Sequence, residues 1–385
     1  MSAPARRESP AVSAAWRWGR LAVLAVLLAF GAVFPLVFSN QLTTYYAVLT
    51  LIFVAGVVAW NLFSGYSGYI SLGHAVFFGA GAYAVGLLAL HQQLDSSIIF
   101  ATLPLAGLAG AAVAVPFGLI ALRVRRHTFV VVTIAVFFIF QLMAFNLSFT
   151  HGNGGVSPPF LNWDPNTVYN PFYYAALITA AGALLLSWLI RGSRFGLQLL
   201  AIRDDEDRAR GLGVRAMRVK LTAFLISAFI TGIVGGLWIF FIGQALPETA
   251  FDPTYDLTVA LMGFLGGFGT LWGPVLGALI MEPLQQQITQ RSSAPYLGEI
   301  VLGGLFLLVI LFLSRGLLPT GGEWVTALRA RWDRRSRPPA AAVRAAGSVA
   351  GPPAGTVAAD VDQGTGQDSV AAAEHSGVPR KGGAR

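Results

Sequence analysis

Cysteine is absent from this 385-residue sequence, and charged side chains are scarce. The first absence excludes a disulfide framework and any thiolate metal site. Charged residues make up 11% of the sequence, whereas an ordinary soluble domain carries roughly 25%. The deficit is greatest between Leu21 and Ile190, where the charged residues are Asp95, Arg123, Arg125, Arg126 and Asp164. So few charges could not cover a soluble surface of that length, so we expect a lipid bilayer around this part and exclude a soluble enzyme.

Lysine is also rare, since Lys220 and Lys381 are the only two in the chain. Neither lies in a phosphate-binding loop of the form G-x-x-x-x-G-K-[ST]. We therefore expect no bound cofactor, with ATP and magnesium bound by other chains if transport is ATP-driven. The net charge of +8 does not indicate nucleic acid, because the basic residues flank apolar runs, a pattern typical of cytoplasmic loops.

Several apolar runs are long enough to cross about 30 Å of hydrocarbon, which takes roughly 20 residues. They are 21–39, 46–63, 69–90, 98–122, 128–148, 171–190, 219–243 and 297–314. Another run, 256–283, is longer and rich in glycine. A single crossing there would place the basic tail that begins at Arg315 outside, against the preference of basic residues for the cytoplasmic side. We therefore expect two pieces, about 257–266 and 271–283, and a cytoplasmic carboxyl terminus.

The predicted fold class is all-α, a polytopic transmembrane helical bundle with interrupted helices near 64–74 and 263–273. Glycines make both interruptions possible, and non-helical backbone at membrane depth survives only where protein or a watery cavity satisfies it. Paired interruptions in a transporter indicate its substrate pathway. The candidate pathway residues are Tyr66, Ser67, Tyr69, Ser71, Gly73, His74, Gly266, Gly267 and Thr270.

A structural role is the alternative for each of these residues. The hydroxyls of Ser67, Ser71 and Thr270 can satisfy backbone groups freed by the interruptions, and tyrosines gather at bilayer interfaces. His74 can fix the broken backbone near Gly73 through a ring nitrogen. We expect neither a catalytic residue nor a metal site, because no carboxylate is near His74 in the sequence.

The segment 191–220 holds eight basic residues and is expected on the cytoplasmic side. Within it, Asp204 to Gly213 predicts a short helix. Asp204 is expected to cap its start, and Gly211 and Gly213 to end it.

Side-chain pairs are expected to support this short helix. Asp204 with Arg208 and Glu206 with Arg210 have favourable spacing, each pair contributing about 0.3–0.5 kcal/mol, and Asp207 occupies the capping-box position. That support is too small for so short a helix in water, which favours a docked helix. A solvated loop with alternating charges is the alternative.

The run from Asn61 to Tyr83, NLFSGYSGYISLGHAVFFGAGAY, resembles the amino-terminal signature of permease subunits of branched-chain amino acid ABC importers. Three further stretches, 201–213, 263–277 and 314–317, resemble the same family in the same order. Together they cover roughly 15–320, and the likeness is closest to the longer of the two permease types that such importers pair.

The resemblance implies a transport subunit rather than an enzyme, in the bacterial inner membrane with both termini cytoplasmic. Its implied partners are two ABC ATPase subunits, a second permease subunit and an extracytoplasmic solute-binding protein. Composition and charge divide the chain into three expected regions: a cytoplasmic basic amino terminus 1–20, a permease domain 21–318 and a cytoplasmic tail 319–385, which we expect to be disordered.

In that family a cytoplasmic E-A-A-x-x-x-G motif forms the helix that couples to the ATPase. Here Ala209 and Gly213 match its third and seventh positions, while Asp207 replaces the Glu and Arg208 the first Ala. The implied coupling residues are Asp204, Asp205, Glu206, Asp207, Arg208, Ala209 and Gly213. After Thr133-Ile134-Ala135, where the family usually has an intramembrane Gly-Glu pair, this chain has Val136-Phe137-Phe138.

These features predict a permease for a branched-chain or other hydrophobic amino acid, or a related small solute. The alternatives are an ABC permease for urea or short amides and a stand-alone carrier or channel for small neutral solutes. Ion-coupled carriers often use an intramembrane charge. No Asp, Glu, Lys or Arg lies between Leu21 and Leu90, which disfavours the stand-alone carrier.

Overall fold

The computed structural model covers most of the predicted spans. It describes residues 31–35, 37, 40–93, 98–147, 150, 152–159, 163–164, 167–291, 300, 303–304, 307 and 317. The predicted regions 1–20, 21–39, 297–314 and 319–385 lie wholly or largely outside these residues.

The described elements are almost all helical, in agreement with the predicted all-α class. In chain order they are α2 (Gln41–Trp60), the π-helical turn η1 (Asn61–Gly65), α3 (His74–Gln92), the 3-10 turn η2 (Ile99–Thr102), α4 (Leu103–Ala121), α5 (Arg126–Asn146), the 3-10 turn η4 (Gly152–Gly154), α6 (Tyr169–Arg191), α7 (Arg194–Asp204), α8 (Glu206–Gly211), α9 (Ala216–Ile242), α10 (Pro247–Ala250), α11 (Pro253–Gly266) and α12 (Gly273–Arg291). Outside the helices, Val156 and Ala245 form an isolated antiparallel bridge.

Six of the described helical segments are long and apolar enough to cross a membrane, α2 with η1, α3, η2 with α4, α5, α6 and α9. Each coincides with a predicted span, so the apolar runs located these helices. Their burial differs: 83% of the apolar window is buried in α2 with η1, against 22% in α5. The first segment therefore lies at the centre of the bundle, and α5 presents an apolar surface suited to lipid.

Close helix packing at the centre depends on glycine. A Cβ at Gly81 in α3 would collide with the carbonyl of Gly232 in α9, and a Cβ at Gly235 would collide with the carbonyl of Phe78. Small residues at such contacts let helices approach closely in a membrane. The glycines of α3 therefore serve packing within this chain.

Both predicted interruptions are present. Between η1 and α3 the chain leaves the helix, and α3 begins only at His74. The second apolar stretch is broken as well, because α11 ends at Gly266 and α12 begins at Gly273. Gly267, with a φ of +131°, follows directly after α11 in a conformation that favours glycine. The two pieces expected in this stretch are therefore confirmed, although α12 runs on to Arg291.

One predicted boundary is wrong, because the predicted span 69–90 begins too early. Side chains, rather than helical carbonyls, satisfy the backbone before His74: the N–H of Ser71 donates to Ser64 Oγ at 3.2 Å, and that of Leu72 to Thr133 Oγ1 at 3.2 Å. We call residues 66–73 the first interruption and residues 267–272 the second interruption.

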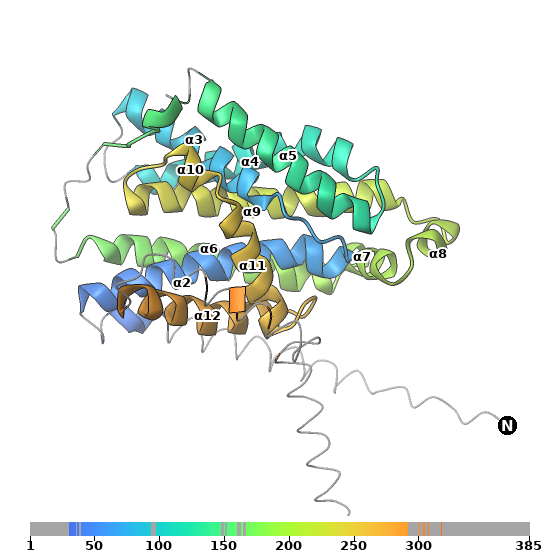
Figure 1. Cartoon of the computed structure of the whole chain (residues 1–385). Coiled ribbons are helices and arrows are strands. Elements are labelled where there is room, and N and C mark those ends of the chain that lie inside the picture. The colour runs from blue at the N-terminus through green and yellow to red at the C-terminus, as the bar shows by residue number, and fades with distance from the viewer. Residues whose placement is uncertain are drawn as a thin grey trace, which may run out of the picture. The chain divides into compact units, whose positions relative to one another are not determined.

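Figure 1 shows α7 and α8 together at one end of the bundle. The same end contains the last residues of α6 and the first residues of α9, since short connections join them to α7 and α8. We call it the α8 end.

Candidate functional site

The short helix α8 begins one residue later than the predicted cap allows. Asp205, not Asp204, caps it: Asp205 Oδ1 accepts the N–H groups of Asp207 and Arg208, each at 3.0 Å. Asp204 is the last residue of α7, and the chain is extended at Asp205, so only the Asp205 side chain reaches the free N–H groups. The backbone N–H of Arg208 is the main reason that the pKa of Asp205 lies below its ordinary value.

One of the two predicted side-chain pairs is confirmed and the other is wrong. Glu206 pairs with Arg210, as predicted. Arg208 pairs with Asp205, with 3.0 Å between Nε and Oδ2, because Asp204 belongs to the preceding helix. Gly211 ends the helix and Gly213, with a φ of +88°, follows it, as predicted.

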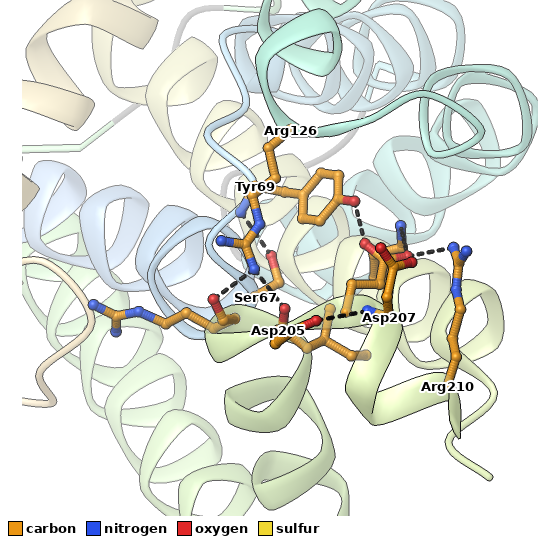
Figure 2. Close-up of polar contacts among 10 residues, drawn as sticks. Ser67, Tyr69, Arg126, Asp205, Asp207 and Arg210 are labelled. Atoms are coloured by element: carbon orange, nitrogen blue, oxygen red, sulfur yellow. Dashed lines mark hydrogen bonds and ion pairs between the residues drawn. The ribbon is translucent and has the colours of Figure 1, made fainter. Parts of the chain in front are cut away.

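Glu206, the first residue of α8, meets three donors, of which Tyr69 and Arg210 are labelled in Figure 2. The hydroxyl of Tyr69 donates to Oε2, Lys220 Nζ donates to Oε1 at 2.9 Å, and Arg210 also donates to Oε1. Lys220 is 1% exposed, and its Nζ lies 4.2 Å from the centroid of the Tyr69 ring. We call Tyr69, Glu206, Arg210 and Lys220 the Glu206 cluster.

The charge of Glu206 is stabilised by this cluster. Burial opposes ionisation of the carboxyl, but the hydrogen bonds from Tyr69 and Lys220 and the nearby cations outweigh it, so the pKa of Glu206 lies below its ordinary value. The ionised carboxylate is the counterion of buried Lys220. It therefore fixes α8 both to the first interruption and to the start of α9.

Two arginines connect α7 with its surroundings. The guanidinium of Arg126, at the start of α5, donates to the carbonyls of Ile202 and Arg203 at the end of α7, as Figure 2 shows. Arg203 in turn donates from Nη1 to the carbonyl of Gly65 at 2.9 Å. The α7–α8 segment therefore contacts the chain directly before and within the first interruption.

The π-helical turn η1, which leads into the first interruption, meets the second interruption at its first residue, Asn61. Asn61 Nδ2 donates to the carbonyl of Thr270 at 2.9 Å, and Asn61 Oδ1 accepts the N–H of Gly269 at 2.8 Å. Arg191, the last residue of α6, donates to the carbonyl of Gly269 at 2.6 Å. We call the contact made by Asn61, Gly65, Gly269 and Thr270 the clasp.

The other end of the first interruption is deep in the bundle, around His74. Its Nδ1 lies 3.1 Å from Ser71 Oγ and its Nε2 2.8 Å from Ser227 Oγ. Because the Ser227 hydroxyl donates its single proton to the carbonyl of Ala59 at 2.6 Å, Nε2 is the donor in the neutral ring, and Nδ1 accepts from Ser71. We expected His74 to fix the local backbone through a ring nitrogen. Its two ring nitrogens instead contact the hydroxyls of Ser71 and Ser227.

Asp256, in α11, caps α3 from 182 residues away. Its Oδ1 accepts the N–H groups of His74 at 2.9 Å and Ala75 at 3.2 Å, and the side chain is buried. Reasoning along the sequence missed this residue, although an acid inside an apolar run is itself a signal of a functional or structural role. We call Ser71, His74, Ser227 and Asp256 the His74 cluster.

The structure divides the predicted pathway residues between these places. Tyr66, Ser67, Tyr69 and Thr270 lie toward the α8 end, whereas Ser71 and His74 lie deeper. The Tyr66 hydroxyl is 2.8 Å from Ser187 Oγ, Ser67 Oγ accepts the N–H of Tyr69, and Thr270 Oγ1 donates to the carbonyl of Gly267 at 2.8 Å.

Two of the three glycines among the predicted pathway residues, Gly73 and Gly266, have packing contacts instead. A Cβ at Gly73 would meet the Phe117 ring at 2.7 Å, and one at Gly266 would collide with the carbonyl of Gly273. The hydroxyl contacts of Ser67 and Thr270 match the structural alternative, whereas Tyr66 and Tyr69 are buried within the bundle rather than at a bilayer interface. The pathway role stays a prediction. Within the described ranges, no group of three His, Cys, Asp or Glu side chains could hold a metal ion.

Comparisons with known proteins agree with this architecture. Residues 42–310 match the family model described as branched-chain amino acid transport system / permease component. The high-affinity branched-chain amino acid transport system permease protein LivM of Escherichia coli (strain K12) is 30% identical, over 77% of this chain and 74% of that protein. The L-arabinose ABC transporter permease protein AraH of Azospirillum brasilense is 26% identical, over 34% of this chain and 40% of that protein. No solved structure matches the chain.

Proposed function

Because this chain belongs to the family of permease components of branched-chain amino acid transport systems, we propose that it is the membrane subunit of an ATP-driven importer for hydrophobic amino acids. Two ABC ATPase subunits, a second permease subunit and an extracytoplasmic solute-binding protein complete the assembly. ATP and magnesium bind to the ATPase chains. The subunit lies in the bacterial inner membrane with both termini cytoplasmic, which places the α8 end on the cytoplasmic side.

The single observation that carries this proposal is the attachment of α8 to the first interruption through Glu206 and Tyr69. Six residues are too few for a helix that is stable alone in water, so α8 owes its position to these contacts. Its outer surface is exposed, with Arg208 and Leu212 largely open to solvent. That surface suits a cytoplasmic partner, and we assign it to the ATPase.

Movement of α8 has two routes into the membrane. Glu206 connects it to Tyr69 in the first interruption, and Arg203 connects α7 to Gly65. When ATP binding closes the ATPase subunits, displacement of α8 moves both contacts together. The interruptions then change position between the two sides of the bundle, and the substrate passes between them.

The scarcity of charge on the described spans supports an apolar or neutral substrate. An apolar amino acid side chain needs little polar recognition inside the permease, because the binding protein can supply selectivity before the substrate arrives. Urea and short amides are neutral as well, so the substrate test must include them alongside leucine, isoleucine and valine.

Reconstitution tests the proposal. The full chain is co-expressed with the ATPase, permease and binding-protein genes adjacent to its own gene, purified in mild detergent and placed in proteoliposomes. The expected result is co-purification of the ATPase and uptake of a radiolabelled hydrophobic amino acid that requires ATP. Absence of any associated ATPase under gentle conditions contradicts the proposal.

Asp256 favours one rival enough to require its own measurement. Ion-coupled carriers often use an ionisable residue inside the membrane, and Asp256 is an acid buried among the helices of the bundle. Its carboxylate already accepts two backbone N–H groups of α3, which accounts for its presence structurally. Uptake driven by a proton or sodium gradient, with neither ATP nor ATPase present, would establish the rival instead.

A further inference from the structure

One side chain of η1, the turn that leads directly into the first interruption, joins this part of the chain to the second interruption. Asn61 is 1% exposed, and both ends of its amide are used by the second interruption: Nδ2 by the carbonyl of Thr270 and Oδ1 by the N–H of Gly269. A buried amide that satisfies a donor and an acceptor on one backbone segment fixes that segment as a backbone pairing would. Separation of the interruptions therefore requires both hydrogen bonds to break.

The local backbone is shaped around this contact. The π-helical turn η1 starts at Asn61, and such turns occur mostly as single insertions in helices, frequently at functional sites. A Cβ at Gly65 would collide with Asn61 Oδ1 and would lie 3.0 Å from the Cα of Gly269. Gly269 has a φ of +75°, so glycine on both sides lets the two backbones touch.

Two guanidinium groups hold the clasp from outside. Arg203 donates to Gly65, on the first side, and Arg191 donates to Gly269, on the second. Each arginine also lies over an aromatic ring next to the clasp, Arg203 at 5.3 Å from the centroid of Phe268 and Arg191 at 5.4 Å from that of Tyr66. Both arginines belong to the α6–α7 segment that leads into α8.

We infer that Asn61 is a positioning residue for transport: it makes the two interruptions open and close as one unit at the α8 end. This inference rests on the proposed function, in which α8 is the element that moves. Displacement of α7 shifts Gly65 through Arg203, and Asn61 carries the shift to Gly269 and Thr270. Without Asn61, each interruption moves independently.

Thiol labelling tests the clasp without any partner protein. The chain contains no cysteine, so a single introduced cysteine is its only thiol. Ser67→Cys reports on the first interruption, where Ser67 is fully buried, and Leu271→Cys reports on the second, where Leu271 is partly buried. The full-length chain is expressed in cells, and inside-out vesicles are prepared from their membranes. The vesicles are then exposed to a membrane-impermeant maleimide.

Asn61→Ala is expected to raise the labelling rate at both positions by about tenfold, because it removes two buried hydrogen bonds that favour the closed arrangement. Asn61→Asp keeps the acceptor for the N–H of Gly269 but places an oxygen against the carbonyl of Thr270, so an intermediate rate is expected. Thr231→Val is the control, since Thr231 is equally buried and its hydroxyl bonds only to the carbonyl of Ser227 in its own helix.

The outcomes separate the clasp from the proposed function. Labelling that rises at one reporter only, or at neither, contradicts the clasp whether or not the chain is part of an importer. An equal rise with Thr231→Val also contradicts it, since general loosening would then explain the result. A faster rate at both reporters supports the clasp even if no ATPase ever associates, in which case only the proposed function fails.

Discussion

At the α8 end the first interruption meets ionised side chains, whereas at its deep end it meets serine hydroxyls, a neutral imidazole and a carboxylate bound to backbone N–H groups. Lys220 of the Glu206 cluster and Ser227 of the His74 cluster both lie on α9, seven residues apart, which is about 10 Å at 1.5 Å per residue. Over that distance the chemistry changes completely, although the same short segment of chain connects the two clusters.

The difference follows from the cost of burying charge. An ion pair near the bundle end keeps part of its hydration, since the Glu206 side chain is 13% exposed, while a pair at greater depth would lose all of it. The deep cluster therefore contains no ion pair among the described residues: hydroxyls contact His74, and two backbone N–H groups of α3 stabilise the Asp256 carboxyl. We interpret the ionic end as the part that receives movement and the capped end as the fixed part.

The largest expected effect is loss of the Glu206 carboxylate. Glu206→Ala leaves the buried ammonium of Lys220 without a counterion, so we expect the free energy of unfolding to fall by about 3 kcal/mol. Thermal unfolding in detergent measures this. The double variant Glu206→Ala with Lys220→Met should regain most of the loss, whereas Arg208→Ala, which removes an exposed pair on the same helix, should leave the unfolding temperature unchanged. Equal effects of the two single substitutions would contradict the ionic role of this end.

A smaller effect is expected at the deep end. Asp256→Ala leaves the N–H groups of His74 and Ala75 without acceptors, at a cost of about 2 kcal/mol, and Asp256→Asn should cost less because the amide oxygen still accepts. The comparison variant is Asp252→Ala, which removes the cap of α11 made with the N–H of Thr254 and should cost about 1 kcal/mol. Unfolding in detergent ranks the three. A loss with Asp256→Asn as large as with Asp256→Ala would show that charge, not capping, matters there.

The smallest expected effect is the loss of stability at acidic pH. We expect this loss to arise from Glu206, at the ionic end. The pKa of Glu206 is lowered from 4.5 in the folded protein, so its stabilisation is fully present above that value and is lost as the pH falls through the lowered pKa. Unfolding temperatures of the wild type should therefore decline more steeply below about pH 4.5 than those of Glu206→Gln. Parallel declines would contradict an ionised Glu206 in the folded state.

Much of the bundle could be predicted from the sequence, because hydrocarbon thickness sets the length of an apolar run and glycine indicates where a helix can break. The six long helices and the break between Gly266 and Gly273 follow from these two facts. The start of α3 did not follow, since the side chains of Ser64 and Thr133 accept the backbone N–H groups of Ser71 and Leu72 and so satisfy the non-helical chain before His74.

The contacts that define the candidate site could be predicted only in part. The pair Glu206–Arg210 is local, within one helical turn, and local spacing predicts it. Asp256 meets partners 181 and 182 residues away, and Asn61 meets partners 208 and 209 residues away. No rule of local spacing reaches so far. The predicted cap of α8 was wrong for a related reason. Because α7 ends at Asp204, the backbone becomes extended at Asp205, and that residue caps α8.

The central claim is that α8 moves the first interruption through the hydrogen bond between Tyr69 and Glu206. Tyr69→Phe removes that bond and keeps the ring against Lys220, and Tyr173→Phe, near the opposite end of α6, is the matched control. The most direct measurement is the number of substrate molecules transported per ATP hydrolysed by the reconstituted importer. We expect Tyr69→Phe to lower this ratio about tenfold, since a hydrogen bond to an ionised group contributes about 1.5–3 kcal/mol, while ATP hydrolysis continues. An unchanged ratio would contradict the account.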